Sequence, residues 1–429
     1  MTEQEPHALY LGADVGTSGV RVCALDDQGG LRGQEVVDLP AGVRGDGRHE
    51  QDPEAWWEAL VAAAARLAAG LPEAPVRGLA LDSTSGTLLL ADRAGRPLGP
   101  AVMYDDRRAT AAAEAIARAA PAESGAHGAN SSLAKLLHLL GQGEGERAGH
   151  ALHAADWLTG RLTGAFGVSD ENNALKLGYD PVGRGWPDWM RELVPGDLLP
   201  EVVAPGSRVG TLATEPAERM GLAAGIPVQA GTTDSIAGFL ATGAGGVGEA
   251  VTSLGSTLAL KVVAERPVFA PEYGVYSHRL GQRWLAGGAS NSGGAVLRRF
   301  FTDAELAELT PRLHPERPTG LDYLPLPETG ERFPDNDPEL APRLEPRPAD
   351  RAEFLQGLLE GIAAIEARGY RRLAELGAPY PGSVRTVGGG AANAAWTRIR
   401  ADLLGVAVAA AENGEAACGA ARLAAGRLS

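Results

Sequence analysis

Two runs of apolar residues, separated by a turn of small residues, open the chain. Residues 10–13 are mostly apolar and lead into Asp14, residues 16–19 are Gly-Thr-Ser-Gly, and residues 20–25 form a second, largely apolar run. Short apolar runs bounded by turn residues are typical of strands, so the pattern predicts two strands joined by a tight turn. A further turn signal at residues 26–30 extends the prediction to a β-meander.

Farther along, the pattern alternates between helical spacing and short apolar runs. Residues 52–70 carry apolar side chains at helical spacing, with Asp52 suited to cap the helix and Pro53 to its first turn. The other predicted elements are two strands around a polar break at 83–87, mostly helix over 109–165, a loop over 181–206, a strand and a helix around 227–243, a strand pair from 249, a loop over 324–350, a long helix over 352–376, a strand, triple-glycine turn and helix over 386–405, and a terminal Ala-rich helix.

The glycine-rich run 243–248 marks a predicted domain boundary, because a new strand pair begins directly after it. We therefore divide the chain into domains 1–244 and 245–429. Each half opens with an apolar strand that ends in a Gly/Ser/Thr turn and continues as mixed helices and strands, so the predicted fold class is α/β. A chain of 429 residues is long enough for two such domains.

Composition and charge narrow the function classes. Hydrophobic residues make up 44% and charged residues 22%, which is typical of folded globular chains. The net charge is 39 − 54 = −15, and so acidic a surface repels nucleic-acid phosphates and anionic lipid. The only cysteines are Cys23 and Cys418, and no signal peptide is visible at the N-terminus. We expect a cytoplasmic protein without nucleic-acid or membrane partners.

One stretch with a single charged residue, 221–248, is long enough to cross a bilayer. It contains Pro227, Gln229 and eight glycines, and crossing would bury the carboxylate of Asp234. We interpret it as buried core of a soluble protein.

Several common nucleotide and metal motifs are excluded. None of the three lysines follows a glycine, so there is no GxxxxGK phosphate loop, and Lys261 lacks the accompanying motifs of protein kinases. Residues 243–248 match GxGxxG but follow a predicted helix, which favours a hinge over a dinucleotide site. His150, His153 and Asp156 share helical spacing, but no fourth ligand supports a metal site.

Three turns at the ends of predicted strands carry candidate chemistry. Asp14, with the small residues after it, sets a carboxylate beside backbone N–H groups, which suits phosphate oxygens and Mg²⁺; a plain hairpin turn is the alternative. Residues 253–257, Ser-Leu-Gly-Ser-Thr, repeat this arrangement in the second half. Residues 388–393 form a glycine-dense turn that admits a flat ligand close to the backbone. Together the turns indicate a nucleotide held between two domains.

Asp234 is the only charged residue of the 221–248 stretch and lies in the polar turn 231–235. A carboxylate between a strand and a helix serves either as a helix N-cap or as a catalytic base. Both interpretations remain open from the residues alone.

In this order the motifs resemble those of the FGGY carbohydrate kinases of the actin-like ATPase superfamily. The resemblance extends along nearly the whole chain, and within the family it is strongest to the short D-ribulokinase, xylulokinase-like group of cyanobacteria and plants. The segments that carry it are DVGTSGVR at 14–21, QDPEAWW at 51–57, DRAGRPLGPAVMYDDRRA at 92–109, GLAAGIPVQAGTTD at 221–234, SLGST at 253–257 and GGGAANAAWTRIRADLLGVAV at 388–408.

The resemblance implies two ribonuclease-H-like domains with ATP and sugar in the cleft between them, the first domain binding sugar and the second ATP. It assigns Asp234 as the catalytic base, Asp14 as the residue that organises Mg²⁺, and Asp14, Ser85 and Asp234 as sugar-binding residues. The residues implied to bind ATP are Gly16, Thr17, Ser18, Gly255, Ser256, Thr257, Gly388, Gly389, Gly390, Asn393 and Trp396.

The chain also departs from the family pattern. The Lys-aromatic-x-Trp signature has become Lys-Leu-Leu-His at 135–138, and the second FGGY signature is hard to find near 357–376. The chain is shorter than most members. These departures affect the expected surface insertions and oligomer contacts more than the expected chemistry. For the oligomeric state we expect a monomer or a homodimer.

We therefore expect an ATP- and Mg²⁺-dependent kinase that phosphorylates a terminal hydroxyl of a pentulose, with D-ribulose ahead of D-xylulose and glycerol. The substrate prediction depends on residues 82–87, Asp-Ser-Thr-Ser-Gly-Thr, which resemble the Asp-x-Thr-Ser-x-Thr of ribulokinases; a turn that merely satisfies its own backbone is the alternative. The other functions considered are a xylulokinase or other polyol or ketose kinase, an actin-like nucleotide switch or scaffold, and an ATPase that acts without sugar.

Overall fold

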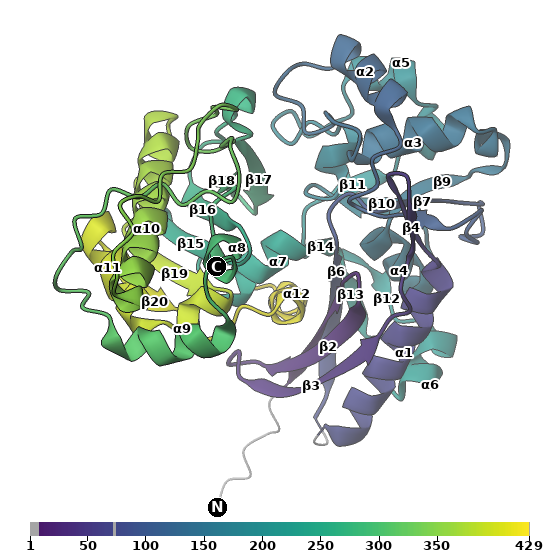
Figure 1. The fold of residues 1–429 in the computed structure, drawn as a ribbon. Helices are drawn as coiled ribbons and strands as arrows, with labels where there is room; N and C mark the ends of the chain where they lie inside the picture. The colour runs from purple at the N-terminus through teal and green to yellow at the C-terminus, as the bar shows by residue number, and fades with distance from the viewer. Residues whose placement is uncertain (1–7, 72–73, 429) are drawn as a thin grey trace, which may run out of the picture. The chain divides into compact units, whose positions relative to one another are not determined.

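The computed structural model describes residues 8–71 and 74–428, which form two compact units (Figure 1). Unit 1 comprises the chain up to Gly243 together with the segment from Glu415, and unit 2 comprises Ala244–Gly414. Residues 1–7, which belong to the segment where no signal peptide is visible, lie outside the described residues.

Unit 1 is built around a seven-stranded mixed sheet with the order β12-β13-β6-β1-β2-β3, in which β14 also pairs with β6. β1 pairs antiparallel with β2 and parallel with β6. Successive residues of β2 point to opposite faces, so Val20 and Val22 pack with α1 while Cys23 packs with α12. The strands are β1 (Leu9–Val15), β2 (Gly19–Asp26), β3 (Leu31–Asp38), β6 (Val76–Ser83), β12 (Arg208–Thr211), β13 (Pro227–Gln229) and β14 (Thr232–Thr233).

Smaller sheets and helices complete unit 1. The second sheet contains β4 (Val43–Gly45), β5 (Arg48–Gln51), β7 (Leu88–Ala91), β8 (Ala101–Val102) and β9 (His150–His153), and β10 (Val168–Asp170) pairs with β11 (Glu201–Val203). The helices are α1 (Pro53–Gly70), α2 (Thr110–Ala119), α3 (Ser132–Gly141), α4 (Ala154–Thr163), α5 (Asp188–Leu193), α6 (Thr214–Met220), α7 (Asp234–Ala241) and α12 (Ala416–Ala424). Asp52 caps α1 as predicted, accepting a hydrogen bond from the Glu54 N–H at 3.0 Å.

Unit 2 repeats the topology of the main sheet of unit 1. Its order is β17-β18-β16-β15-β19-β20, in which β15 pairs antiparallel with β16 and parallel with β19. The predicted two-domain α/β fold is therefore confirmed. The strands are β15 (Glu249–Leu254), β16 (Leu258–Ala264), β17 (Tyr276–Leu280), β18 (Arg283–Ser290), β19 (Ser383–Val387) and β20 (Ala407–Ala410). The helices are α8 (Gly294–Arg298), α9 (Asp303–Leu309), α10 (Arg351–Glu375) and α11 (Ala394–Leu404).

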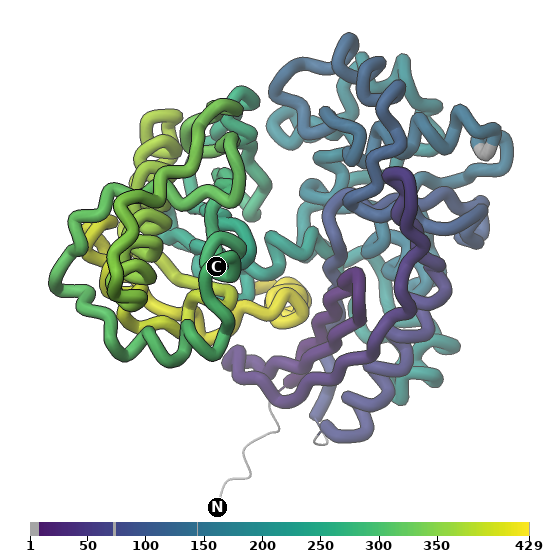
Figure 2. Tube along the Cα trace, in the orientation of Figure 1, coloured from purple at the N-terminus to yellow at the C-terminus, as the bar shows by residue number. Residues whose placement is uncertain are grey.

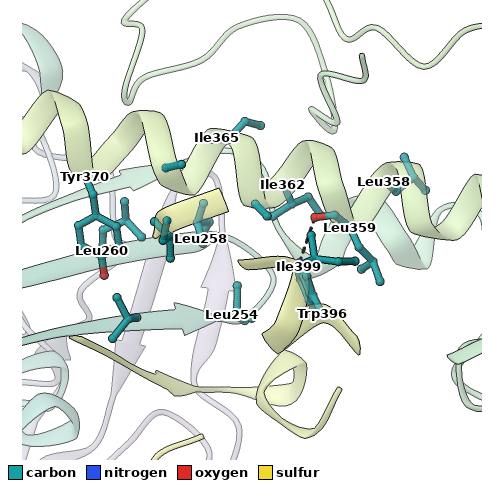
Figure 3. Packing of buried hydrophobic residues seen from close by; sticks show 14 of the residues in the cluster. Leu254, Leu258, Leu260, Leu358, Leu359, Ile362, Ile365, Tyr370, Trp396 and Ile399 are labelled. Atoms are coloured by element: carbon teal, nitrogen blue, oxygen red, sulfur yellow. Dashed lines mark hydrogen bonds between the residues drawn. The ribbon is translucent and has the colours of Figure 1, made fainter. Parts of the chain in front are cut away.

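The core of unit 2 lies between its sheet and helices α10 and α11 (Figure 3). Leucines of β15 and β16, including Leu254 and Leu260, face Ile362 of α10 and Ile399 of α11 in this buried cluster. Most apolar side chains of α10 are removed from water, and this burial supplies most of the free energy that holds the long helix in the unit.

Local patterning missed short elements that depend on distant partners. His150–His153 lies in the region predicted as helical, yet forms β9, because its residues pair with β7. The predicted loop 181–206 contains α5 and β11. Four-residue strands carry little periodic signal and are stabilised by pairing, so sequence spacing alone does not reveal them.

The stretch 221–248, whose only charged residue is Asp234, contains β13, β14 and α7. Among residues 8–71 and 74–428, no helix is both long enough and apolar enough to cross a membrane.

The terminal helix α12 belongs to unit 1, whereas the predicted division placed it in the second domain. The C-terminal segment returns to lie beside the N-terminal strands (Figure 2), where α12 packs on β1 and α7. This approach is possible because both surfaces carry glycine. A Cβ atom on Gly12 would lie 1.9 Å from the Ala417 carbonyl oxygen, and one on Gly419 would lie 1.8 Å from the Ala237 carbonyl oxygen.

We predict that Gly419→Ala destabilises the protein although alanine favours helices. The propensity gain is about 1 kcal/mol, whereas the added methyl meets backbone and forces α12 away from α7, which costs roughly 1–3 kcal/mol or more. The free energy of unfolding from urea titration should therefore fall. Gly70→Ala, at the end of α1 with no atom within 4 Å of the added methyl, is the matched control and should change it little. Equal effects of the two substitutions would contradict the packing described.

Candidate active site

Three carboxyl groups lie at the ends of three neighbouring strands of unit 1. Asp14 of β1 is the pairing partner of Asp82 of β6. Thr233, the last residue of β14, pairs with Ser83, so Asp234 follows directly as the first residue of α7. β1, β6 and β14 run parallel, and the carboxyl ends of parallel strands meet at one edge of the sheet, where ligands commonly bind.

Asp82 is fully buried, and no protein donor reaches either of its carboxyl oxygens. Burial raises the pKa of Asp82 well above its ordinary value, and the negative charges of Asp14 and Asp234 raise it further. Burial also raises the pKa of Asp14, which a hydrogen bond with Asp82 opposes and the charge of Asp234 reinforces. Burial and the crowding of the carboxyl groups thus raise the pKa of both residues, and that of Asp82 more strongly.

The turn between β1 and β2 presents backbone donors. The Gly16 N–H donates to the Gly19 carbonyl at 3.0 Å, which closes the turn. The Thr17 carbonyl accepts from the Gln51 side-chain amide at 2.7 Å, and the Ser18 carbonyl accepts from a backbone N–H just beyond β3 at 2.8 Å. With these carbonyls engaged, the backbone N–H groups of Thr17 and Ser18 have no acceptor within the described chain, and such donors suit an anion.

Hydroxyl groups at the end of β6 and in the turn that follows make hydrogen bonds to other described residues, except for the hydroxyl of Ser85. The Ser83 hydroxyl accepts from the Ala155 N–H at 3.1 Å, and the hydroxyls of Thr84 and Thr87 are hydrogen-bonded at 2.6 Å. Ser85 is half-buried, and its hydroxyl makes no hydrogen bond to the described part of the chain. Ser85 is therefore the member of this turn that is available to a ligand.

Two lysines hold the backbone of the same turn, and sequence reasoning assigned neither of them to the site. Lys135 of α3 is fully buried and donates to the carbonyls of Gly86 at 2.7 Å and Asn130 at 2.9 Å. The Lys176 ammonium lies 3.4 Å from the Ser85 carbonyl. The rarity of lysine could have drawn attention to them, since two of only three lysines in the chain occur here. That both lie at the same turn is visible only in the folded chain.

The Lys135 ammonium is buried and lies near charges of both signs. The pKa of Lys135 is lowered to about 7, first by burial and then by the charge of Lys176, whereas the carboxylates of Asp106 and Asp105 oppose the shift. These two carboxylates follow β8 in the family-like segment 92–109, so the fold brings that segment into the electrostatic surroundings of the Ser85 turn.

The buried polar segment 170–173, at the end of β10, contacts β14. The Asn172 side-chain amide donates to the Thr232 hydroxyl at 3.1 Å. Asp170 accepts from the backbone of Asn172 at 2.8 Å and from the side chain of Asn173 at 2.6 Å, while burial and the charge of Asp156 raise the pKa of Asp170 to about 7. This segment thus anchors the strand that leads into Asp234.

In unit 2, the turn 255–257 is supported by α8, which sequence reasoning did not connect to it. The carbonyls of Gly255 and Ser256 accept from the N–H groups of the first two residues of α8 at 2.9 and 3.1 Å. Arg298 of α8 donates to the Ser256 hydroxyl at 2.7 Å. Within the described residues, the N–H groups of Ser256 and Thr257 have no acceptor and remain available to an anion.

The triple-glycine turn packs directly on the end of β15. Gly388 has φ +87°, and a Cβ atom there would lie 2.7 Å from the Leu254 carbonyl oxygen. A Cβ atom on Gly390 would lie 2.8 Å from the Leu254 Cβ. Only glycine permits this approach, which sets the turn 388–390 against the strand that ends in the turn 255–257.

Asn393 and Trp396 hold this turn in place. The Asn393 side chain caps α11, accepting from the Trp396 N–H at 2.9 Å. Trp396 is 2% exposed, and its indole N–H donates to the Leu359 carbonyl at 3.1 Å (Figure 3). The indole therefore supports the turn from within the core and does not present a face to the surface.

The carboxyl groups of unit 1 fit a magnesium ion that arrives with phosphate. No group of three or more His, Cys, Asp or Glu side chains in the described chain is arranged to hold a metal by itself. Mg²⁺ commonly binds through one or two carboxylates together with substrate phosphates and water. The pKa of Asp14 is raised by burial and by the charge of Asp234, and a cation beside Asp14 would offset that repulsion.

Comparison with known proteins gives the family of the chain. Residues 9–241 match the N-terminal domain of the FGGY family of carbohydrate kinases, and residues 250–427 match the C-terminal domain. The xylulose kinase of Escherichia coli K12 is 29% identical over 443 residues, covering 97% of this chain and 89% of that protein. The autoinducer-2 kinase of Yersinia enterocolitica is 28% identical over 450 residues, covering 93% and 82%. The crystal structure of a "xyloylose kinase" from Brucella ovis superposes with a TM-score of 0.88 at 28% identity, covering 98% and 90%.

The chain thus belongs to the FGGY family of carbohydrate kinases. It is an enzyme that transfers a phosphoryl group from ATP to a sugar, and it is similar to xylulose kinases. The predicted family, fold class and enzyme class are confirmed. The sugar itself and the role of each site residue are matters for the proposal below.

We predict that Lys135 makes the stability of the protein depend on pH. Its pKa is about 7 in the folded chain and about 10.4 when unfolded, so the unfolded chain binds more protons between these values. Stability contributed by this residue therefore rises with pH above 7. The unfolding free energy of wild type minus that of Lys135→Met should increase by about 2 kcal/mol from pH 7 to 9. A difference that stays constant across this range in urea titrations would contradict a buried, partly neutral lysine.

Proposed function

We propose that this enzyme phosphorylates the terminal hydroxyl of a pentulose, with Asp234 as the catalytic base. The observation that carries the proposal is the meeting of Asp14, Asp82 and Asp234 at one sheet edge, where burial raises the pKa of Asp82 well above its ordinary value. A neighbour with a raised pKa adds less negative charge beside Asp234, and a carboxylate in that place can accept the proton of an attacking hydroxyl.

Asp234 is well placed for this role. It is half-buried at the start of α7, and one carboxylate oxygen accepts from the Ser235 N–H at 2.6 Å, which restrains its orientation. The sugar hydroxyl would give its proton to Asp234 as its oxygen bonds to the γ-phosphorus and the bond to the ADP oxygen breaks. Asp14 would bind the sugar and organise Mg²⁺, which supplies charge neutralisation at the phosphates.

The remaining turns would bind ATP. In unit 1, the N–H groups after Gly16, on Thr17 and Ser18, would face phosphate oxygens. In unit 2, the turns 255–257 and 388–390 would bind phosphate and adenosine, with Asn393 and Trp396 acting through the second turn. This assigns sugar and base to the domain 1–244 and most ATP contacts to the domain that begins at 245.

For the sugar, we propose D-ribulose, supported by Ser85. Its hydroxyl is short, can donate and accept, and is the one in its turn left without an internal partner. A buried hydroxyl discriminates between epimers because the wrong configuration leaves it unpaired, at a cost of about 1–3 kcal/mol. D-xylulose is the second candidate, and the names of the relatives in Escherichia coli and Brucella ovis favour it.

We predict that Asp234→Asn leaves the protein folded and lowers turnover roughly 10²- to 10⁴-fold, the usual worth of a positioned general base. ADP release in a coupled assay with D-ribulose and D-xylulose measures the effect. Asp303→Asn changes another carboxylate at the first position of a helix and serves as the matched control. If Asp234→Asn retains more than about a tenth of wild-type turnover, Asp234 is not the base.

We predict a higher kcat/KM for D-ribulose than for D-xylulose, and a loss of that preference in Ser85→Ala. Removing the hydroxyl should cost the preferred epimer about 10-fold or more in kcat/KM, while the KM for ATP stays near wild type. Thr84→Ser keeps a hydroxyl in the same turn and is the control. A wild-type preference for D-xylulose would replace the substrate and leave the kinase mechanism unchanged.

A further inference from the structure

A fully buried ion pair lies beneath the two candidate ATP turns of unit 2. Arg400 of α11 donates to Glu366 of α10 through two parallel hydrogen bonds, Nε to Oε2 at 2.6 Å and Nη2 to Oε1 at 2.7 Å. Both side chains are completely shielded from solvent. The pair therefore joins α10 to α11 inside the core of this unit.

The same pair is hydrogen-bonded to the two strands that carry the turns. Arg400 Nη1 donates to the Thr386 hydroxyl of β19 at 2.7 Å. The Thr252 hydroxyl of β15 donates to Glu366 Oε1 at 2.6 Å, and the Tyr370 hydroxyl lies 2.8 Å from the same threonine oxygen. Four elements thus meet at one polar network with directional contacts.

The two threonines are placed where they can control the turns. Thr252 and Thr386 are direct partners in the parallel pairing of β15 with β19. The turn 255–257 begins three residues after Thr252, and the turn 388–390 begins two residues after Thr386. A shift of one strand along the other would change the spacing of the two turns by the same amount.

Packing alone does not require this network. The surrounding cluster is apolar, and burying two charges in such a core costs desolvation that their attraction only partly repays. Apolar side chains of similar volume commonly serve stability as well or better. What the ion pair adds is directional geometry, because a planar guanidinium and a carboxylate meet in one orientation.

We propose that Arg400 and Glu366 are positioning residues for ATP. Through Thr252 and Thr386 they hold β15 and β19 in the relative register that sets the turns 255–257 and 388–390 at the spacing the nucleotide needs. This inference rests on the proposed function, because it takes these two turns as the ATP-binding elements.

The test is nucleotide binding by a variant that removes the pair without leaving a lone buried charge. Arg400→Met with Glu366→Leu should remain folded and bind MgADP about tenfold more weakly in calorimetry, since small misplacements of binding groups are costly. The KM for ATP should rise by a similar factor while the KM for the sugar stays near wild type. Arg400→Lys with native Glu366 should recover only part of the affinity, because lysine cannot make the two parallel bonds.

An exposed ion pair on the same helix provides the matched control. Arg398→Met with Asp402→Leu removes a 2.9 Å pair from the surface of α11 and should leave the MgADP affinity unchanged. Wild-type affinity in the Arg400/Glu366 double variant would overturn the inference and leave the proposed function standing. Failure of the wild-type enzyme to bind MgADP would overturn both.

If the double variant does not fold, Thr252→Val and Thr386→Val replace it. Each substitution removes one link to a strand and keeps the ion pair and side-chain shape. Weaker MgADP binding at an unchanged sugar KM supports the inference, and wild-type MgADP affinity in both variants overturns it.

Discussion

The parallel pairing of β1 with β6, and of β6 with β14, is the constraint on which the site depends. It places Asp14, Asp82 and Asp234 at one edge of the sheet, where three negative charges would repel one another in a region poor in water. Burial and the charges of Asp14 and Asp234 raise the pKa of Asp82, and a higher pKa favours the neutral form that relieves this repulsion. The pairing itself depends on Gly231, where a Cβ atom would lie 1.8 Å from the Leu81 carbonyl oxygen.

Unit 2 uses the same topology for different chemistry. The strand β15 pairs with β16 and β19 as β1 pairs with β2 and β6, yet the ends of β15 and β19 carry glycine and hydroxyl residues in place of carboxylates. Backbone N–H groups attract phosphate, whereas a carboxyl cluster attracts a cation or a hydroxyl proton. One supersecondary pattern thus supplies an edge of carboxyl groups in unit 1 and an edge of glycine and hydroxyl residues in unit 2, for which we propose anion binding.

Close backbone contact is what makes these edges possible. Gly12 and Gly419 admit α12 onto the sheet of unit 1, and Gly388 and Gly390 admit the triple-glycine turn onto β15. At these four glycines any side chain would displace one element from another. Polar side chains then restrain the backbone of such turns. Lys135, for example, donates a hydrogen bond to the Gly86 carbonyl in the turn that contains Ser85.

The sequence by itself determined the strand–turn–strand openings of both halves, the long helices and the family, because these depend on contiguous patterns that any local reading detects. It also singled out Asp14, Asp234 and the three turns. Only the tertiary structure decided that α12 belongs to unit 1, that β9 is a strand, that Trp396 lies in the core, and that Asp82, Lys135 and α8 surround the predicted residues. Those facts arise from contacts between residues far apart in the chain. The pKa of a buried group and the pairing of a short strand depend on neighbours that only the folded chain brings close.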